Sequence, residues 1–513
     1  MSKISKEIIN FKFGFHHFII VLLPVLFIFV DNINELPLDA ILIPLSISLL
    51  IILISWIVMK HFIGEGKSSI ILSILIISFL IFSFTRSVLI HHEIEEIKFI
   101  ATNLILIPIF LLPITLIIIQ ILRKEFSSDV NQIMNIISIT VFSFLIFQVG
   151  LFYSTDISYD EVQKLVDTPI FSINESNLKP NVYFLLLDAY SGSITLKNDF
   201  GYDNSEFYNQ LEQRGFFVQK ESFSNYPNTG LSIPSIVNMN YLDFLVKLQG
   251  TDSKDMRLPS KLSANNKVMQ VFKSLEYDIY SFYGHEGKSK DVTENFCKYY
   301  LDLHPGLMSV LINYYIPIST VRENLIEDKH HDNVMCILET TMNFENKKDK
   351  PFYMHMHVMF PHQPLIFDSE GNKINDPIAA NRFDDELKNA YLQQLIFANK
   401  KTLEMIDSIQ EKNPQNVIIL ISDHGGRFGI NWSNPTEMDY FRAFNNLSAL
   451  YFPGQESNIP NHVSNVNIFR IFFNLYFDTN YEILDERLIW YDYTQPFLHK
   501  DVTKLVKSSS LRN

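Results

Sequence analysis

Two carboxylates in this sequence each stand at the end of a short, almost wholly apolar run of residues. Asp188 follows the first run, and Asp423 follows the second, with His424, Gly425 and Gly426 directly after it. Oxygen and nitrogen donors of this kind suit Zn²⁺ or Mn²⁺, and the glycines would let a ligand approach the backbone. A single Asp in such a position is better explained as the N-cap of a following helix. The repetition of the pattern favours a metal site.

A hydroxyl-rich turn lies between the two carboxylates in the chain. It covers residues 224–235, includes Thr229 and Ser232, and runs into a helix-like segment. A hydroxyl group at the start of a helix lies where backbone N–H groups and the helix dipole stabilise an anion. Serine and threonine are also preferred N-caps. Taken alone, the turn therefore favours a structural hydroxyl over a catalytic one.

Three histidines occur in or just after a further predicted strand, residues 352–359. His355 and His357 share one face of this strand by alternation, so at least one of them is expected to be structural. His362 follows in a proline-rich loop, and functional side chains concentrate in loops that a rigid scaffold positions. His362 is therefore the stronger functional candidate of the three.

The elements that must position these residues alternate between strands and helices. The runs 181–187 and 416–421 lack alternating polar residues, which is typical of strands in a parallel sheet buried on both faces. A short helix is predicted over 204–214, closed by Gly215, and a long amphipathic helix over 384–411. In open α/β sheets, ligands bind beyond the carboxyl ends of the strands, which is where the two carboxylates fall.

The first third of the chain is strongly apolar and predicts a membrane domain. Five apolar segments precede residue 155, and each is close to the roughly 20 residues that a spanning helix needs. Four segments after the first, with no small-residue cleavage site, argue against a signal peptide. No charged residue lies in the middle of a segment, so we expect an anchor rather than a transporter. The segments are approximately 15–31, 37–59, 69–90, 99–122 and 134–153.

The short loops between these segments predict their orientation. Loops on one side are basic, whereas those on the other side are mainly acidic, and the basic side faces the cytoplasm. An odd number of spans then places residues 155–513 outside the cytoplasm. The basic residues are Lys3, Lys6, Lys12, Lys60, Lys67, Arg123 and Lys124, and the acidic residues are Asp31, Glu35, Glu93, Glu95 and Glu96.

Length, charge and cysteine content set the remaining bounds. A chain of 513 residues is too long for one ordinary core, and its net charge of −14 argues against nucleic acid as a partner. The two cysteines, Cys297 and Cys336, make neither a disulfide framework nor a thiolate zinc site. Whether they pair stays open. The predicted division is a membrane domain (1–153), a linker (154–180), a catalytic domain (181–499) and a basic, disordered tail (500–513).

Taken together, these residues resemble the alkaline phosphatase superfamily, in its sulfatase-like, membrane-anchored branch. That branch includes the lipid A phosphoethanolamine transferases and the lipoteichoic acid synthases. The resemblance implies an α-helical membrane anchor of five transmembrane helices, followed by an α/β domain with a mostly parallel sheet covered by helices. It implies that Asp188, Thr229, Asp423 and His424 hold at least one divalent ion, Zn²⁺ or Mn²⁺. Thr229, in Thr-Gly-Leu-Ser-Ile-Pro, would be the nucleophile.

The same resemblance implies roles for residues that contact the substrate. His357 and His362 are similar to a His-x4-His-x-Pro pattern in which the second histidine contacts the substrate or a second metal ion. We therefore expect His362 to be catalytic, and His357 and His362 to bind substrate. Arg427 is a further substrate-binding candidate, because a guanidinium group pairs well with phosphate. A salt bridge from Arg427 to a nearby carboxylate remains an equal alternative.

The sequence also departs from the family pattern. The sulfatase signature is incomplete, because Ser232-Ile-Pro-Ser235 is followed by Ile236 instead of arginine. This departure argues against formylglycine-based hydrolysis and leaves Ser232 as an alternative nucleophile. Downstream of His424, His462 lies in a loop with no matching pattern, so that one metal ion is expected more firmly than two.

The predicted function is that of a metal-dependent phosphotransferase in a bacterial plasma membrane, with a cytoplasmic N-terminus and a periplasmic or extracellular catalytic domain. Its threonine nucleophile would move a phospholipid-derived head group, of the phosphoethanolamine or glycerol phosphate type, to a cell-envelope glycan. Metal coordination is the natural way to activate a threonine hydroxyl at neutral pH. Two alternatives stay open: a sulfatase or phosphodiesterase that hydrolyses its ester, and a non-catalytic envelope scaffold.

Overall fold

The computed structural model describes residues 14–33, 36, 38–90, 103–123, 128–154, 166, 179–282, 291–297, 319–348, 350–378 and 383–512. The chain divides into two compact units, residues 1–156 with 301–326 and residues 157–300 with 327–513. The predicted linker and the N-terminal lysines lie almost wholly outside the described residues, as does the acidic loop around residue 95. The predicted domain boundaries therefore stay a prediction.

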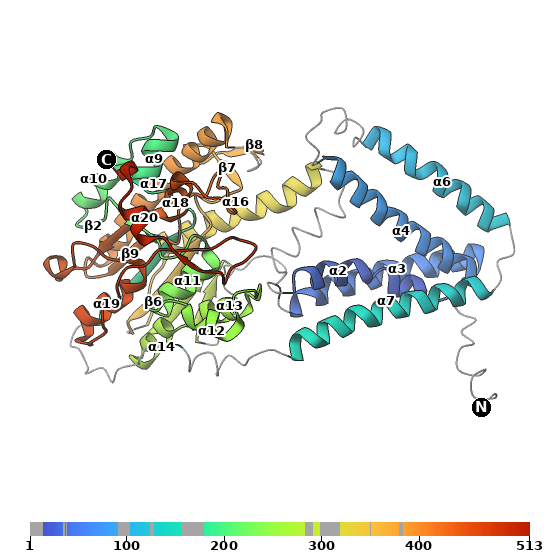
Figure 1. The fold of residues 1–513 in the computed structure, drawn as a ribbon, viewed down its shortest axis with the longest axis horizontal. Helices are drawn as coiled ribbons and strands as arrows, with labels where there is room; N and C mark the ends of the chain where they lie inside the picture. Colours follow the sequence, from blue (N-terminus) through green and yellow to red (C-terminus); the bar gives the residue numbers. More distant parts are fainter. Residues whose placement is uncertain are drawn as a thin grey trace. The chain divides into compact units, whose positions relative to one another are not determined.

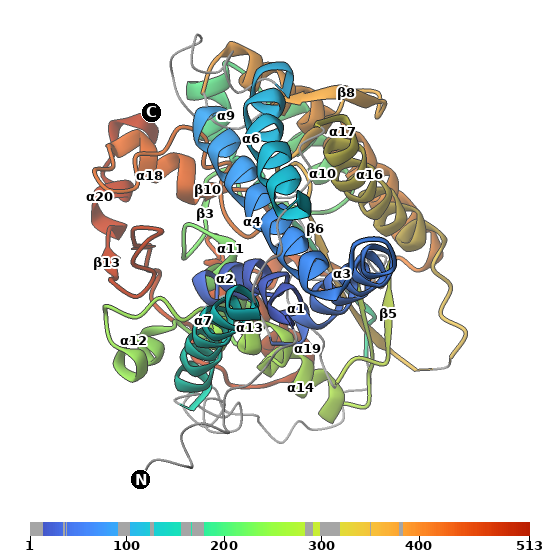
Figure 2. The same cartoon turned by 90° about the vertical axis from the view of Figure 1, so that its right-hand side faces the viewer.

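The first unit is helical and contains four helices, among the residues described, that are long and apolar enough to cross a membrane. These features identify a membrane protein. The helices of this unit are α1 (His16–Ile20), α2 (Leu23–Asp31), η1 (Leu38–Ile41), α3 (Leu42–Ile63), α4 (Glu65–Ile90), α6 (Asn103–Arg123) and α7 (Ser128–Ser154). In Figures 1 and 2, α4 and α6 run side by side, and in Figure 1 α2 lies along α7.

The prediction of five spanning helices is corrected to four, with one shorter apolar segment. The first predicted span is the stretch His16–Asp31, which falls below spanning length. It consists of two helices, α1 and α2, separated by a turn at Val21 and Leu22. Pro24 in the first turn of α2 has no N–H to donate to the preceding turn, which favours a helix start there.

A layer of buried polar side chains joins α1, α4 and α7. His16 Nδ1 lies 2.6 Å from Ser73 Oγ, and His16 Nε2 lies 3.0 Å from Asn131 Oδ1. Asn135 Oδ1 accepts hydrogen bonds from the backbone N–H groups of Phe15 and His16, at 3.0 Å and 2.9 Å. We call these residues the His16 layer. Because α1, α4 and α7 all contribute to this layer, its hydrogen bonds hold the three helices together.

The second unit is built on a seven-stranded sheet in the order β2-β11-β9-β1-β6-β4-β5. The five strands from β9 to β5 pair in parallel, and β11 and β2 complete one edge in antiparallel pairing. The mostly parallel sheet confirms the predicted fold class. The strands are β1 (Val182–Leu187), β2 (Phe217–Val218), β4 (Asp278–Phe282), β5 (Glu294–Phe296), β6 (Phe352–Val358), β9 (Val417–Ser422) and β11 (Ser448–Tyr451).

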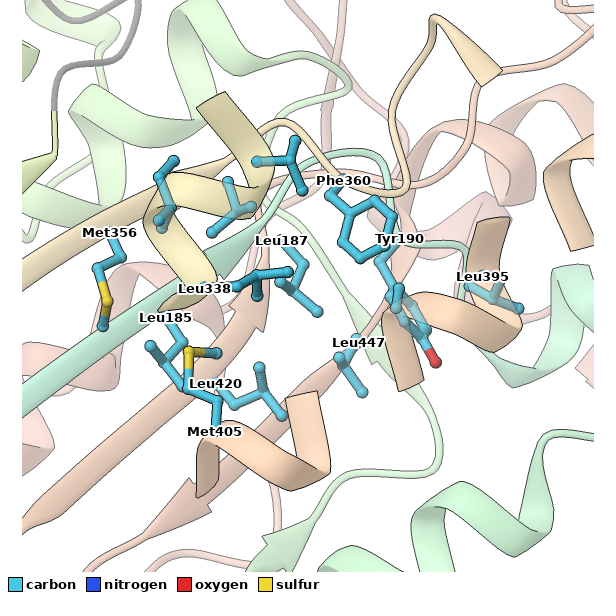
Figure 3. Close-up of a cluster of buried hydrophobic side chains, with 14 of the residues drawn as sticks. Leu185, Leu187, Tyr190, Leu338, Met356, Phe360, Leu395, Met405, Leu420 and Leu447 are labelled. Atoms are coloured by element: carbon cyan, nitrogen blue, oxygen red, sulfur yellow. The ribbon is translucent and has the colours of Figure 1, made fainter. Parts of the chain in front are cut away.

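Both faces of this sheet are covered by helices. Successive side chains of a strand point to opposite faces, and every residue of β1 is buried, so neither face of β1 is exposed to solvent. Tyr183, Leu185 and Leu187 pack in one hydrophobic cluster with residues of α10, α16 and α17. Figure 3 shows part of this cluster, with side chains from β1, β6, β9, α16 and α17 in one layer. On the opposite face, Phe184 and Leu186 pack against α11, α14 and α19.

The covering helices match the predicted ones closely. The helix predicted over 204–214 is α10 (Ser205–Gln213), and the one predicted over 384–411 is α17 (Asp385–Lys412). The other principal helices are α9 (Ser193–Phe200), α11 (Thr229–Val237), α12 (Asp243–Gln249), α13 (Arg257–Ala264), α14 (Lys267–Ser274), α16 (Ser319–Asn343), α18 (Glu437–Phe444), α19 (Ile468–Phe477) and α20 (Thr503–Lys507). Three two-stranded sheets pair β3 (Ser222–Phe223) with β10 (Asn445–Asn446), β7 (Leu365–Phe367) with β8 (Lys373–Ile378), and β12 (Ile489–Trp490) with β13 (Lys500–Asp501).

The prediction of a disordered tail from residue 500 is wrong for the residues described. Lys500 pairs with Trp490 across the β12–β13 ladder, and α20 follows. Val502 and Val506 are buried in a cluster with Phe444 and Trp490. Although this segment is basic, its two apolar residues Val502 and Val506 lie at helical spacing and pack against the rest of the unit.

Cys297 and Cys336 form a disulfide, with their Cα atoms 5.8 Å apart. The bond joins the residue after β5 to α16. This pairing answers the question that the sequence left open. A structural disulfide is typical of proteins that fold in an oxidising compartment outside the cytoplasm.

Candidate metal centre

Three neighbouring parallel strands bring the candidate ligands to one edge of the sheet. Asp188 follows β1, and its partners come from the two strands that pair with β1. Leu187 pairs with Ser422 on one side, which places Asp423 next to Asp188. On the other side, Leu186 pairs with His357, so that this imidazole reaches the same edge. The three side chains are buried, although Asp188 and Asp423 are separated by 235 residues in sequence.

The turn after β1 is held by hydrogen bonds from its neighbours. Ala189 has a φ of 57°, a left-handed conformation that non-glycine residues adopt only when surrounding contacts enforce it. Its N–H donates to Asp423 Oδ1 at 3.3 Å. The next N–H, of Tyr190, donates to Ser422 Oγ at 2.9 Å. The Tyr391 hydroxyl donates to the Ala189 carbonyl at 2.9 Å. These contacts fix the direction in which Asp188 leaves the sheet.

The hydrogen bonds of His424 define which ring nitrogen faces the centre. Nδ1 lies 2.7 Å from the carbonyl oxygen of Gly425, and a carbonyl only accepts, so Nδ1 carries the proton. In the neutral ring, Nε2 is then left with a lone pair. It lies 3.2 Å from Asp423 Oδ2 and 3.5 Å from Asp188 Oδ1. An outward hydrogen bond from the distal ring nitrogen is the usual support of a metal-binding histidine.

Thr229 presents its hydroxyl to the same group from the start of α11. Its Oγ1 lies 2.7 Å from Asp423 Oδ2 and 3.1 Å from His424 Nε2. Thr229 is the first residue of α11, with Asn228 as N-cap, so the orphan N–H groups of the first helical turn surround it. The hydroxyl therefore has a proton acceptor on one side and a region favourable to anions on the other.

The pKa shifts in this cluster indicate that it would bind a cation favourably. Burial and the nearby charge of Asp188 raise the pKa of Asp423 to about 7. Burial alone would raise the pKa of Asp188 as well, but the charge of His362 and the contacts with His357 and His424 hold it well below its usual range. Burial and the charge of Arg427 lower the pKa of His424, which keeps its ring neutral. Two carboxylates in so small a buried volume repel each other unless a cation lies between them.

The residues present fit a divalent metal ion. One ligand atom from each of Asp188, His357 and Asp423 lies within 4.8 Å of the others. Asp188 Oδ1 is buried and has no hydrogen-bond partner among the described residues, and a buried carboxylate oxygen is costly to leave unpaired. His424 Nε2 adds a fourth donor. Carboxylate oxygens and imidazole nitrogens are donors that such ions prefer.

His357 lies inside the cluster of candidate ligands, a position that the sequence did not predict for it. The sequence suggested contact with the substrate, but His357 Nε2 lies 3.2 Å from Asp188 Oδ2, inside the cluster of candidate ligands. Its position in β6, directly beside β1, is responsible. This proximity could not be read from the sequence, because only the order of strands in the sheet makes β6 a neighbour of β1.

His362 and Arg427 lie together beside the centre. Arg427 Nη2 is 3.4 Å from His362 Nε2. His362 Nδ1 donates to the carbonyl of Gln363, which turns Nε2 towards the guanidinium group. Arg427 also has a left-handed backbone, with a φ of 57°. Within the described residues, neither of the two forms a salt bridge, so the alternative of an Arg427–carboxylate pair is not what the structure shows.

The glycines after His424 serve packing. A Cβ on Gly425 would come within 2.3 Å of the Arg442 carbonyl oxygen, and one on Gly426 within 2.5 Å of Ser191 Oγ. The space at both glycines is therefore filled by the protein itself, which corrects the expectation that they admit a ligand. Ser232, the alternative nucleophile, is fully buried and donates its hydroxyl to the Asp423 carbonyl at 2.6 Å. That bond turns it away from the centre.

Two supporting residues were not identified from the sequence. Ser422 accepts from the Tyr190 N–H and donates to the His424 carbonyl at 2.6 Å, so it braces both turns at once. Tyr391, in the second turn of α17, accepts from the Ser191 N–H with the hydroxyl that it donates to the Ala189 carbonyl. The only local signal was a serine directly before Asp423, and nothing in the sequence connects Tyr391 to the turn.

Comparison with known proteins identifies the family of residues 180–470. The family model described as Sulfatase matches residues 180–470, more than half of the chain. No curated protein matches the sequence. The C-terminal periplasmic domain of EptC from Escherichia coli is a similar solved structure, at 13% identity, a TM-score of 0.40, and coverage of 64% of this chain and 94% of that one. The integral membrane phosphoethanolamine transferase EptA from Neisseria meningitidis is 13% identical, with a TM-score of 0.37 over 89% of this chain and 95% of that one.

Proposed function

The chain belongs to the sulfatase family, and from that premise we propose that it is a metal-dependent phosphotransferase of a bacterial plasma membrane. Its substrate would be a phospholipid, whose phosphoryl head group, of the phosphoethanolamine or glycerol phosphate type, passes to a hydroxyl of an envelope glycan. Asp188, His357, Asp423 and His424 would hold one divalent ion, Zn²⁺ or Mn²⁺, beside Thr229. That the chain is a sulfatase-like enzyme follows from its family. The transfer of a phospholipid head group to a glycan is our proposal.

The observation that carries the proposal is the placement of the Thr229 hydroxyl. Among the described hydroxyl groups near the cluster, Ser232 and Ser422 are engaged with backbone groups. Thr229 alone points at the carboxylate and the imidazole, 2.7 Å and 3.1 Å away. A purely structural threonine at a helix start would instead accept from a backbone N–H. Ser232, which occupies the cysteine or serine position of the sulfatase signature, is bonded to the Asp423 carbonyl instead.

The bound ion would supply charge to lower the pKa of the Thr229 hydroxyl and to offset the negative charge of the phosphoryl group. The residues themselves have separate tasks. Asp423 Oδ2 is the nearest acceptor for the Thr229 proton. Ser422 and Gly425 hold Asp423 and His424 in orientation through backbone and ring hydrogen bonds. Arg427 lies where it can pair with a phosphoryl oxygen.

The proposed reaction has two balanced halves. In the first, the oxygen of Thr229 forms a bond to phosphorus, and the bond from phosphorus to the diacylglycerol oxygen breaks. The hydroxyl proton of Thr229 passes to Asp423, and the departing alkoxide takes a proton from His362. In the second half, a glycan hydroxyl gives its proton to His362 and its oxygen to phosphorus. The bond to Thr229 then breaks, and the threonine regains its proton.

The membrane unit and the disulfide support an outward-facing catalytic unit. The lysine-rich and arginine-containing ends of the helices lie on one side, with Lys60, Lys67 and Arg123 at the ends of α3, α4 and α6. This pattern favours a cytoplasmic position for these ends. The Cys297–Cys336 bond favours an oxidising compartment for the second unit. A non-permeant maleimide should label a cysteine introduced at the exposed Tyr493 in intact cells, while both native cysteines stay unlabelled.

The decisive experiment is a search for the phosphoryl adduct on Thr229. The full-length protein, in nanodiscs with its metal ion, is incubated with ³²P-labelled phosphatidylethanolamine or phosphatidylglycerol and digested for mass spectrometry. The proposal expects the label on the peptide that contains Thr229, and its absence in Thr229→Ala. Ser232→Ala is the matched control, because its hydroxyl lies three residues away and should leave the adduct in place.

The other outcomes separate the alternatives. An adduct that water discharges, with no transfer to any glycan of an envelope extract, would identify a phosphodiesterase. Turnover of sulfate esters without a phospholipid adduct would overturn the proposal in favour of a sulfatase. A protein that binds metal but turns over neither ester would support the envelope scaffold.

A further inference from the structure

The membrane unit contains a cavity of about 930 Å³ between α1, α2, α4 and α7. All but three of its lining residues are apolar, and the polar ones are Asp31, Ser138 and Gln148. Ser138 donates its hydroxyl to the Asn135 carbonyl of its own helix, so it presents little free polarity. The cavity is therefore apolar along its walls. Its size is at the upper end of the range of small-molecule pockets in proteins.

The cavity has a defined base and a defined rim. Its base lies just beyond the His16 layer, because Ile20, Ile77 and Met134 follow His16, Ser73 and Asn131 by three or four residues in their helices. Its rim is formed by Asp31 and Gln148, the lining residues farthest along α2 and α7 from that layer.

The depth of the cavity matches one leaflet of a bilayer. The apolar lining residues of the continuous helix α7, from Met134 to Leu145, cover eleven helical steps, which is about 16 Å at 1.5 Å per residue. The hydrocarbon core of a bilayer is about 30 Å thick, so each leaflet contributes about 15 Å. The lining residues Phe27, Phe84, Ile137 and Phe144 are also exposed, so the cavity is open to the surrounding lipid. Acyl chains can therefore enter sideways from one leaflet.

The polar residues at the rim indicate the charge of the head group that would lie there. Asp31 is exposed, and it has no ion pair among the described residues. With Gln148 beside the same cavity, it offers a carboxylate and an amide where a lipid head group would lie. A carboxylate in this position attracts an ammonium group and repels a second anion. The basic residues Lys60 and Lys67 belong to the opposite, base end of the helices.

We infer that this cavity binds the acyl chains of a phospholipid of the outer leaflet, with an ammonium-bearing head group at Asp31. This inference rests on the proposed orientation and deepens the proposed function, because it names the donor as a zwitterionic lipid and assigns its tails to the membrane unit. The cavity selects by charge at the rim and by length along the walls.

Photolabelling tests the inference without requiring turnover. The full-length protein is reconstituted in nanodiscs that contain a phosphatidylethanolamine with a diazirine at the end of one acyl chain. Irradiation should place the label near the base, on peptides that contain Ile20 or Met134. Val141→Trp fills the cavity and should reduce this labelling about fivefold or more. Ile136→Trp is the matched control, because Ile136 is an exposed residue of the same helix outside the lining.

The head-group assignment has its own comparison. The same diazirine on phosphatidylglycerol should label the base less than phosphatidylethanolamine does, and Asp31→Asn should remove the difference. Equal labelling of the Val141→Trp and Ile136→Trp proteins, or labels spread along the outward face of α7, would show ordinary boundary lipid and overturn the inference. If Val141→Trp fails to fold, Ile137→Trp, at an exposed lining position, takes its place.

Failure of the inference and failure of the proposed function give different results. Thr229→Ala lies in the other unit and should label normally. A Thr229 adduct without specific base labelling would leave the phosphotransferase standing and reject the lipid cavity. Specific base labelling without any adduct would establish the lipid site and reject the proposed reaction.

Discussion

The protein contains two clusters of buried polar side chains, one in each unit, and they differ in how their polar atoms are satisfied. In the His16 layer, both ring nitrogens of His16 have a hydroxyl or amide partner, and Asn135 caps two backbone N–H groups. At the end of β1, two carboxylates and two imidazoles converge, and Asp188 Oδ1 has no hydrogen-bond partner among the described residues. The first cluster is uncharged and its side chains hydrogen-bond to one another, so we call it closed. The second cluster is charged and leaves a carboxylate oxygen without a hydrogen-bond partner among the described residues, so we call it open.

This difference is the one expected between a structural cluster and a functional one. A buried network whose members satisfy each other stabilises the packing of the helices that carry it. A buried network with two like charges and an unpaired oxygen destabilises the fold unless a ligand supplies the missing charge. The comparison therefore predicts that the same kind of substitution will have opposite consequences in the two clusters.

The largest effect is expected from Asp423→Asn, which keeps the shape of the side chain and removes one charge. Activity should fall by more than about a hundredfold, because residues that only support a metal ligand already contribute about 10- to 100-fold. The metal-free variant should be more stable than the metal-free native protein, by on the order of 1–2 kcal/mol, since repulsion from Asp188 is lost. Metal content and thermal unfolding with and without metal measure both changes.

A loss of stability in the metal-free variant would contradict the view that the open cluster is strained by like charges. Asp199→Asn is a control, because Asp199 is a carboxylate of the same unit that is already paired with Arg442. That substitution should destabilise the protein whether or not metal is present.

Removal of the metal ion is expected to affect only one of the two clusters. A chelator should abolish activity and destabilise the second unit by about 2.7 kcal/mol, if the ion was present at a hundred times its dissociation constant. Zn²⁺ or Mn²⁺ should restore both. Thr229→Ala should show the same stabilisation by metal despite its inactivity, since the carboxylates and imidazoles remain. If chelation left the unfolding of both units unchanged, the cluster at β1 would not be a metal centre.

An intermediate effect is expected from His16→Ala in the closed cluster. The substitution leaves Ser73 and Asn131 without their buried partner, at a cost of about 1–3 kcal/mol for such groups. Thermal unfolding in detergent should report this loss, while metal content and the Thr229 adduct should not change. The comparison variant is Ser46→Ala, whose hydroxyl is exposed and bonded only to its own helix. A change in metal content in His16→Ala would show that the clusters are not independent.

The smallest effect is expected from Ser422→Ala, behind the open cluster. It removes two hydrogen bonds that orient the turns after β1 and β9, each worth about 1 kcal/mol net. The protein should still bind metal, but kcat/KM should fall about tenfold, because the Asp423–His424 turn is less well oriented. Ser433→Ala, in an exposed loop, should change neither quantity. Full loss of metal in Ser422→Ala would make this serine part of the centre itself.

The sequence was informative wherever the signal was local. Apolar runs without polar alternation identified β1 and β9 to within a residue, and helical periodicity identified α10 and α17. The positions of Asp188 and Asp423 at the ends of their strands needed only the rule that parallel strands end at one edge. These features depend on a few neighbouring residues, and such residues determine them directly. The helix that carries Thr229 begins at Thr229 itself, within the stretch 224–235 that was predicted as a turn before a helix-like segment at Ile236.

The sequence was uninformative wherever the answer depended on which elements become neighbours. The apolar stretch 15–31 matched a spanning helix in composition, but a turn before Pro24 divides it. The segment after residue 500 looked disordered, because the cluster that buries Val506 is formed by residues distant in the chain. Gly425 and Gly426 were assigned to ligand approach, because the Arg442 carbonyl and the Ser191 hydroxyl that fill their space are not visible in sequence.

The sequence by itself determined the inventory of this protein: an apolar membrane third, a mostly parallel α/β domain, two carboxylates at strand ends and a threonine in a hydroxyl-rich turn. Only the tertiary structure decided the arrangement. The order β9-β1-β6 sets Asp188 between Asp423 and His357, and makes a candidate ligand of a histidine predicted to touch substrate. The reason is physical. Periodicity and capping act over one or two turns, whereas strand order is a property of the whole packed sheet, in which residues hundreds of positions apart become partners.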